Sequence, residues 1–549
     1  NDFDTAVKDD QTAPSDSNTP VLITKYADKD LFNMAVLNAT TGGATLTFPN
    51  NGTLDMSVYK SSYQGISARY VSNAVTSKNK DTGKTETKAA GIVPLIQGVS
   101  GNGTEIIFDM NVKEYADDDF HAASVGGVFN LFAPVSGTCN VTKLTFTGKT
   151  GTDPKTGVQL QYYTSNGVVT DRNPNWGYQA NIGVGSFAGS SAGTLAQYDG
   201  RKWYIASVQF KNVIFRDMKI SSPNSAGGLI GNAGVRAPDG RGETTAVDIA
   251  ILIQPNAGGR GEGTLYISNT FENCSFSNLK VEGQKAAGGF CGHIDGKVPN
   301  QNNLNVTTQN IIVGKDSTIS ATLEGSCAGG LFGYVKRGVA INNDESGTYT
   351  AIWENVNVEA KGYSGGLIGW LNADHSSPTY NIKNVQISGS VQSKESNQAG
   401  GGLIGQVSGG STITITGCTV NASNIEASSA AGGIVGYLLT PATITGCTVS
   451  GSNSNNSKIE GNKYASGIVG FLEVKGQVAI RNNKVEKLSL ISNATGWSSG
   501  GFIGDVSGNK SSEIFIFDSE VTDCLITGNR AGGFAGTLRG CVKGSNLLL

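Results

Sequence analysis

Residues 364–369 read SGGLIG, residues 400–405 read GGGLIG, and residues 431–436 read AGGIVG. Each segment joins small residues and glycines to two large apolar residues and a final glycine. Segments of this kind occur nine times, and their final glycines are Gly231, Gly292, Gly333, Gly369, Gly405, Gly436, Gly470, Gly504 and Gly536. The last six intervals between these glycines are 36, 36, 31, 34, 34 and 32 residues. A period near 34 residues indicates a repeat protein.

The residues between the glycine motifs decide whether the repeats are helices or strands. Residues 411–420 read STITITGCTV and residues 513–521 read EIFIFDSEV. Both stretches are rich in β-branched residues and alternate with period two, which is typical of strands. We therefore predict an all-β fold, a right-handed parallel β-helix (β-solenoid) with coils of about 34 residues and about three short strands in each coil.

Stacking explains why glycine and asparagine recur. Each coil of a β-solenoid lies about 4.8 Å above the last, so equivalent residues form ladders. The pair Gly365 and Gly366 is predicted to turn the chain at positive φ or to let the backbone of a neighbouring coil come close. Asn355 and Asn384 are predicted to adopt the left-handed conformation at corners.

The sequence pattern changes along the 549-residue chain. Weaker motif copies, GGVFN at 126–130 and GSFAG at 185–189, indicate that the coils begin before residue 130. We predict a flexible leader at 1–20, an N-terminal β cap or small β domain at 21–125, irregular early coils with insertions at 126–225, and a regular solenoid at 226–549. The closing residues Leu547, Leu548 and Leu549 lead us to expect truncation at the C-terminus.

Each motif copy has two glycines, two large apolar residues and a glycine, followed by an aromatic and an aliphatic residue. Over residues 226–540 this pattern resembles the GLUG motif. Copies that depart from it have Ser466 in place of a glycine and Ala535 in place of a large residue. That motif occurs in secreted and surface-anchored bacterial proteins, including non-catalytic regions of some immunoglobulin A metallopeptidases and adhesin-like proteins. The resemblance implies a β-solenoid at the cell surface and assigns no catalytic residue.

Composition excludes several classes of protein. Glycine contributes 76 residues, about twice its usual share of about 7 %, but without the one-in-three period of collagen. The 41 basic and 44 acidic residues give a net charge of −3, which argues against nucleic acid as a partner. No apolar run reaches the roughly 18 residues of a membrane span.

Catalytic and metal-binding patterns are missing from the sequence. The three histidines, His121, His293 and His375, form no H-E-x-x-H pattern, and the eight cysteines form no C-x-x-C pair. The acidic run Asp117, Asp118 and Asp119 is interpreted as a solvated loop. We predict no catalytic, cofactor-binding or metal-binding residue.

Two features could still form sites. Cys418 and Cys447 lie in consecutive ITGCTV segments, so they are expected to stack as buried small residues or, in an oxidising compartment, to form a disulfide. The residue after the motif glycine is aromatic in four copies: Tyr334, Trp370, Tyr437 and Phe471. These four could form an aromatic strip on which sugar rings stack, or they could pack beneath a loop or in the core.

Taken together, the sequence predicts a non-enzymatic extracellular or cell-surface protein, a rigid stalk or adhesin. Its expected partners are glycans or proteins of a host or neighbouring cell, or other copies that associate end to end. One alternative is the subunit of a self-assembling, fimbria-like filament, because an exposed coil end offers a template for another chain. A second alternative is a carbohydrate-active enzyme, or an accessory region of a larger secreted enzyme.

Overall fold

The structure is a computed structural model of the chain. It describes residues 20–21, 36–40, 43–59, 66–67, 75–78, 85–88, 96–115, 125–132, 137–164, 167–169, 183–191, 195–198, 201–233, 265–294, 306–309, 312–341, 351–373, 379–410, 412–451, 457–507, 512–538 and 547–548. The predicted leader at 1–20 therefore lies almost wholly outside the described residues. The acidic run at 117–119 lies outside them as well.

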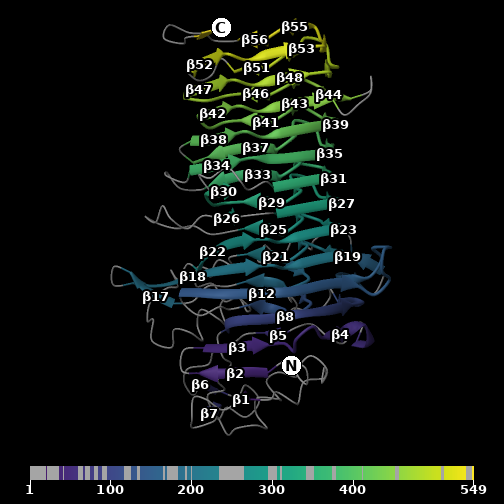
Figure 1. Cartoon of the computed structure of the whole chain (residues 1–549), viewed down its shortest axis with the longest axis vertical. Coiled ribbons are helices and arrows are strands. Elements are labelled where there is room, and N and C mark those ends of the chain that lie inside the picture. The colour runs from purple at the N-terminus through teal and green to yellow at the C-terminus, as the bar shows by residue number, and fades with distance from the viewer. Residues whose placement is uncertain are drawn as a thin grey trace.

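The described strands stack as parallel coils in one tall column, with the N-terminal strands at the bottom and the C-terminal strands at the top (Figure 1). One coil consists of β33 (Ile368–Ala373), β34 (Thr379–Lys383), β35 (Val385–Ser393) and β36 (Ala399–Gly401). Each of these strands pairs in parallel with its counterparts in the coils below and above. The predicted parallel β-solenoid is confirmed.

Two of the walls of the column are narrow sheets. The wall of twelve strands consists of β5 (Ile66–Ser67), β11 (Phe129–Phe132), β16 (Ala188–Ser191), β21 (Ile230–Ala233), β25 (Cys291–Ile294), β29 (Phe332–Val335), β33, β37 (Ile404–Gly409), β41 (Val435–Leu438), β46 (Val469–Leu472), β51 (Ile503–Val506) and β56 (Ala535–Leu538). The wall of eleven strands consists of β10 (Val125–Gly126), β15 (Gly183–Gly185), β20 (Ser225–Gly227), β24 (Ala286–Gly288), β28 (Cys327–Gly329), β32 (Tyr363–Gly365), β36, β40 (Ala430–Gly432), β45 (Tyr464–Ser466), β50 (Ser498–Gly500) and β55 (Arg530–Gly532).

The remaining walls belong to one sheet of 32 strands, in which two runs lie side by side. The first run contains β3 (Gly43–Thr47), β8 (Ile96–Phe108), β12 (Gly137–Gly148), β18 (Arg201–Lys211), β22 (Leu265–Glu272), β26 (Val306–Gln309), β30 (Val339–Ile341), β34, β38 (Thr412–Thr416), β42 (Ala442–Thr445), β47 (Gly476–Arg481), β52 (Ser512–Phe517) and β57 (Leu547–Leu548). The second run contains β4 (Thr53–Asp55), β9 (Met110–Tyr115), β13 (Gly157–Thr164), β19 (Ile214–Ser222), β23 (Ser275–Gly283), β27 (Ile312–Ala321), β31 (Ala351–Ala360), β35, β39 (Thr419–Ala427), β43 (Thr448–Gly451), β44 (Lys458–Gly461), β48 (Lys484–Glu486), β49 (Ser489–Ser492), β53 (Glu520–Thr522) and β54 (Leu525–Thr527).

The coils from β25 to β40 therefore hold four strands each, whereas the sequence predicts about three, and the coils above them hold five because the strand of the second run is interrupted. The extra strand is the three-residue strand of the eleven-stranded wall, and it ends on the first glycine of the motif, as β32 does at Gly365. A strand of three residues, one of them glycine, is too short to show the period-two alternation from which strands are predicted. The strand forms because its backbone is paired with the equivalent strands below and above.

The motif glycines are required because two backbones pass very close to each other. A Cβ added at Gly365 would clash with the carbonyl oxygen of Ile368, and one added at Gly369 would press on the carbonyl oxygen of Gly333 in the coil below. A Cβ added at Gly366, the other glycine of the predicted pair, would clash with the carbonyl oxygen of Gly402 in the next coil. Neither Gly365 nor Gly366 has a positive φ. Of the two predicted reasons for these glycines, the structure selects the close approach and excludes the positive-φ turn.

Positive φ occurs instead in the large sheet, between β34 and β35 at Asn384 and inside β31 at Asn355, where the pairing register shifts. Asn355 has φ of 53° and Asn384 has φ of 50°, as predicted from their places in the sequence. In the following coils the position of Asn384 is taken by Gly417 and Gly446, with φ of 64° and 66°. Asparagine and glycine are the residues that adopt this conformation most readily.

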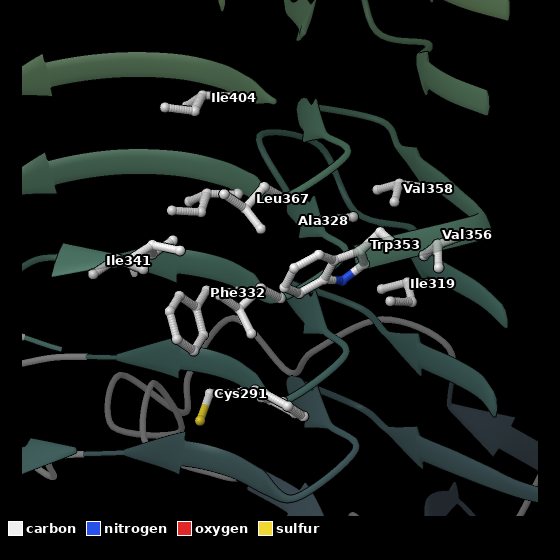
Figure 2. Packing of buried hydrophobic residues seen from close by; sticks show 14 of the residues in the cluster. Cys291, Ile319, Ala328, Phe332, Ile341, Trp353, Val356, Val358, Leu367 and Ile404 are labelled. Atoms are coloured by element: carbon white, nitrogen blue, oxygen red, sulfur yellow. The ribbon is translucent and has the colours of Figure 1, made fainter. Parts of the chain in front are cut away.

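Apolar side chains from the walls fill the interior and form one continuous cluster. Figure 2 shows Trp353 near the middle of this interior, with Phe332 and Leu367 on one side and Ile319 and Val358 on the other. All five side chains are fully or almost fully buried. Burial of this apolar surface stabilises each coil only when a neighbouring coil covers it.

The described N-terminal strands join the same column. β8 pairs in parallel with β12, and β3 and β4 pair in parallel with β8. Beyond β3 the direction changes, because β2 (Val36–Thr40) pairs with β3 and with β1 (Pro20–Val21) in the antiparallel sense. β14 (Gly167–Val169), β17 (Leu195–Tyr198) and the pair β6 (Val75–Lys78) and β7 (Thr85–Lys88) are also antiparallel, and residues Met56–Tyr59 form a 3-10 turn. The division of the chain at residue 126 stays a prediction.

Substitution of one motif glycine tests the close approach directly. A Cβ at Gly501 would clash with the carbonyl oxygen of Gly533 in the next coil, whereas a Cβ at Gly533 would meet no atom within 4 Å. We expect Gly501→Ala to lower the free energy of unfolding by about 1–3 kcal/mol or more. The matched variant Gly533→Ala should stay within about 0.5 kcal/mol of the parent protein. Denaturant unfolding measures both, and equal effects would contradict the account.

Candidate functional site

A break in the inward–outward alternation of the twelve-stranded wall turns one side chain per coil outward. Ile368 pairs with Phe332 and Trp370 pairs with Tyr334, while Gly369 is passed over in the pairing. As a result Ile368 and Leu371 are both fully buried, and Trp370 between them is partly exposed. The coils below and above skip the equivalent glycine, so the register is kept and the alternation breaks at the same position in each coil.

The four predicted aromatic residues lie in one vertical column. Successive pairings connect Asn232, His293, Tyr334, Trp370, Gln406, Tyr437, Phe471, Asp505 and Thr537. The ring centroids of Tyr334 and Trp370 are 4.8 Å apart with planes inclined by 22°, and those of Tyr437 and Phe471 are 5.6 Å apart. His293 extends the column below, with its ring centroid 5.0 Å from that of Tyr334. Gln406 separates the two aromatic pairs.

Three further aromatic residues, which the sequence reasoning missed, bridge and extend this column. Tyr363 contacts both Trp370 and Tyr437, with ring centroids 5.1 and 6.5 Å away. At the upper end Tyr464 stacks on Phe471 at 4.9 Å, and Trp497 meets Tyr464 edge-on at 5.1 Å. We name this set the aromatic ladder, and its members are His293, Tyr334, Tyr363, Trp370, Tyr437, Tyr464, Phe471 and Trp497.

A sequence signal for two of these additions existed. Tyr363 and Tyr464 each stand two residues before the same motif position, held by Gly365 and by Ser466. Pairing of the narrow wall places Ala399 and Ala430 between them. Those alanines, with Tyr464, form a small apolar cluster outside the main core, and Tyr363, Tyr437, Phe471 and Trp497 pack against it.

This packing determines what the aromatic ladder offers to solvent. Tyr334 has His293 and Trp370 stacked against it, and Trp370 has Tyr363 as its other ring neighbour. The ring faces are thus largely occupied by other rings. Six of the eight members are partly exposed, while His293 and Tyr464 are only 6 and 8 % exposed. The exposed parts of a stacked ring are mainly its edges, which carry the positive rim of the aromatic quadrupole.

Polar groups border the aromatic ladder. The indole Nε1 of Trp370 donates a hydrogen bond of 2.7 Å to Ser408, and Asn372 donates one of 3.1 Å to the Tyr334 hydroxyl. The Tyr437 hydroxyl donates to Ser429 at 2.6 Å. These bonds fix the ring orientations and leave a border of hydroxyl and amide groups beside apolar edges.

Two lysines and two phenols set the electrostatics of the aromatic ladder. Lys463 lies over the Trp497 ring at 5.0 Å and Lys336 lies over the Tyr334 ring at 5.5 Å, as in cation–π pairs. Burial raises the pKa of Tyr363 to about 12. Burial also raises the pKa of Tyr437, against a lowering contribution from its bond to Ser429. Both hydroxyls are therefore neutral at physiological pH and keep their protons as hydrogen-bond donors.

The two predicted partner cysteines stack one coil apart. Thr416 pairs with Thr445 and Thr419 pairs with Thr448, which places Cys418 beneath Cys447. Both cysteines are buried free thiols, so the structure has no disulfide at this position. Each sulfur donates instead to a backbone carbonyl oxygen two residues earlier, at 3.5 Å. The alternative interpretation, a ladder of small buried residues, describes this arrangement.

The described residues hold no group of three or more histidine, cysteine, aspartate or glutamate side chains that could bind a metal ion. Of the three histidines, His293 belongs to the aromatic ladder, and His121 and His375 lie outside the described residues. Among the described residues there is also no helix with the length and apolar character of a membrane span.

Comparison with known proteins adds no family. No protein-family model, no curated protein and no solved structure matches this chain. The aromatic ladder is therefore the candidate site, on the basis of its own geometry.

The state of the stacked cysteines can be measured by alkylation. Burial raises the pKa of the Cys418 thiol, whereas the hydrogen bond with Cys418 lowers the pKa of the Cys447 thiol. Both thiols are shielded from solvent, and on that ground the native protein should react slowly at these two positions. After unfolding without reductant, peptides containing Cys418 and Cys447 should both carry the alkyl group, as mass spectrometry can show. A peptide pair linked through these residues would contradict the free-thiol assignment.

Proposed function

We propose that this protein is a non-enzymatic rod that acts outside the cell, as a stalk or adhesin that binds surface glycans or proteins. The observation that carries the proposal is the column of parallel coils from β8 to β56. Each coil contacts its neighbours only, so such a column can hold a binding surface at a fixed place along a stiff body. The resemblance of the repeats to the GLUG motif supports the same location and role.

Ion pairs between coils are consistent with a long, exposed rod. Lys315 of one coil pairs with Glu354 of the next at 2.8 Å, and Lys394 pairs with Glu359. Such surface pairs add little stability, about 0–1 kcal/mol each. Their charged groups keep the outer face of the sheet hydrated and discourage sideways aggregation of the rods.

The aromatic ladder is the adhesive surface in this proposal. Tyrosine and tryptophan dominate the energetically important positions of binding surfaces, because they combine a large apolar area with a polar group. Here Trp370 and Tyr437 are already held by neighbouring rings and by hydrogen bonds. Little side-chain entropy would be lost on binding, which favours affinity.

Binding measured on an array of glycans and on whole cells tests the function. We expect the purified protein to bind without releasing cleavage products. Trp370→Ala and Tyr437→Ala should each weaken binding by about tenfold or more. Thr414→Ala, on the outer face of β38 away from the aromatic ladder, is the matched control and should bind like the parent protein.

A further variant distinguishes weaker binding caused by a blocked surface from weaker binding caused by unfolding. Asn372→Arg keeps every ring and adds a bulky side chain at the border of the aromatic ladder, so it should also weaken binding while the melting temperature changes little. If Trp370→Ala, Tyr437→Ala and Asn372→Arg all bound like the parent protein, the aromatic ladder would be excluded as the adhesive surface. If the parent protein bound no glycan and no cell, the adhesin proposal itself would be overturned.

A further inference from the structure

The aromatic ladder is long and narrow. Four pairing steps separate Tyr334 from Phe471, and at about 4.8 Å each they cover about 19 Å along the axis of the column. Tyr363 connects the two aromatic pairs, because its ring centroid lies 5.1 Å from that of Trp370 and 6.5 Å from that of Tyr437. A ligand that follows the aromatic ladder is therefore elongated and lies parallel to the axis of the column.

The backbone that carries the aromatic ladder is not open for pairing with a ligand. β33 pairs with β29 below and with β37 above, and β41 pairs with β37 below and with β46 above. An extended peptide commonly binds by adding a strand to an open sheet edge, which these strands do not offer. A folded protein partner usually covers about 800 Å², far more than a strip that is two side-chain columns wide. The shape favours a linear chain that is bound through side chains.

The groups beside the rings match the chemistry of a sugar chain. Asn372, Ser408 and Ser429 carry amide and hydroxyl groups that both donate and accept hydrogen bonds, as sugar hydroxyls do. A sugar unit in a linear chain is about as long as one coil is high, so successive units would meet successive coils. Because the ring faces are largely occupied by other rings, these units would contact ring edges rather than stack on ring faces.

Positive charge at the aromatic ladder selects among such chains. The exposed ring edges are the positive rim of the aromatic quadrupole, which attracts anionic groups. Lys336 lies over the Tyr334 ring near the lower end of the aromatic ladder, and Lys463 lies over the Trp497 ring at the upper end. Both lysines can donate charge-assisted hydrogen bonds to a carboxylate. An acidic chain is therefore favoured over a neutral one.

Two glutamates decide where the acidic groups of the ligand would lie. Glu395 and Glu473 place negative charge at the border of the aromatic ladder. One carboxylate oxygen of Glu395 accepts a hydrogen bond of 2.7 Å from the backbone N–H of Gly325, which partly compensates its charge. Glu473 stands two residues after Phe471. The carboxylates of a ligand should therefore lie near the two lysines and away from Glu473.

We propose that the aromatic ladder binds one chain of a linear, carboxylate-bearing polysaccharide, laid along the axis of the column with acidic groups near Lys336 and Lys463. This ligand class deepens the proposed adhesive function and depends on it. The contacts differ from the sugar stacking expected from the sequence, because they are made by ring edges, by the bordering hydroxyl and amide groups, and by the two lysines.

Isothermal titration with a panel of polymers tests the ligand class. The acidic polysaccharides are polygalacturonate, alginate and hyaluronan, the neutral ones are amylose and dextran, and poly-glutamate serves as an acidic peptide. At least one acidic polysaccharide should bind about tenfold more tightly than the neutral polysaccharides and poly-glutamate, and added salt should weaken its binding.

The panel separates this proposal from the adhesive function on which it depends. Neutral chains or poly-glutamate bound as tightly as the acidic polysaccharides would overturn the proposed ligand class and leave the adhesin proposal standing. Binding to cells without binding to any acidic polysaccharide would have the same meaning. A protein that binds neither glycans nor cells would overturn both proposals.

Oligomer length and lysine variants test how the chain lies. Binding of acidic oligomers should tighten up to about five sugar units, one for each coil from Tyr334 to Phe471, and change little beyond that length. Lys336→Gln and Lys463→Gln should each weaken binding of a long chain by up to about fivefold. Lys315→Gln, on the outer face of β27, is the matched control and should bind like the parent protein. A disaccharide that binds as tightly as a long chain, or lysine variants that bind like the control, would overturn the proposal.

Discussion

The close approach of two backbones at each glycine motif is the constraint on which the rest of the structure depends. At Gly365 and Gly369 the short strand β32 and the wall strand β33 come so near to neighbouring backbone that no side chain fits between them. This contact sets the cross-section of the column. With the cross-section fixed, successive coils follow similar paths, their strands pair in parallel, and the interior columns receive apolar residues.

The same constraint produces the candidate site. Because the inward–outward alternation breaks at Gly369, Trp370 turns outward while Leu371 returns to the core. Repetition of this break over successive coils lines up outward side chains at the spacing of the strands, about 4.8 Å, which is a distance at which aromatic rings stack. The aromatic ladder thus follows from the repeat, and it forms only where several successive coils carry rings. Gln406 shows that the fold does not demand an aromatic residue there.

The repeat and its strands can be predicted from the sequence, because period-two β-branched stretches and evenly spaced glycines are local signals. It predicts the column of Tyr334, Trp370, Tyr437 and Phe471 for the same reason. The short strand of Tyr363–Gly365 escapes prediction, since its pairing is entirely between coils. The sequence predicts where glycine is needed but not why. A positive φ and a close approach of two backbones both favour glycine, and only the three-dimensional structure distinguishes them. The packing of Tyr363 against Trp370 and Tyr437 likewise depends on two walls meeting at an angle that no local pattern reports.

The distance between labels placed in one outer column tests the central claim most directly. Glu282, Glu359 and Glu460 belong to a single column, in which Glu282 and Glu460 are five steps apart and Glu359 and Glu460 are three steps apart. Spin labels on cysteines introduced at these positions, with Cys524 and Cys541 replaced by serine, should report backbone separations of about 24 and 14 Å by electron paramagnetic resonance. A short, well-defined distance between residues that are 178 positions apart in the sequence is the result that stacked coils require. Broad distributions, or distances that do not grow with the number of steps, would contradict the stacking of the coils.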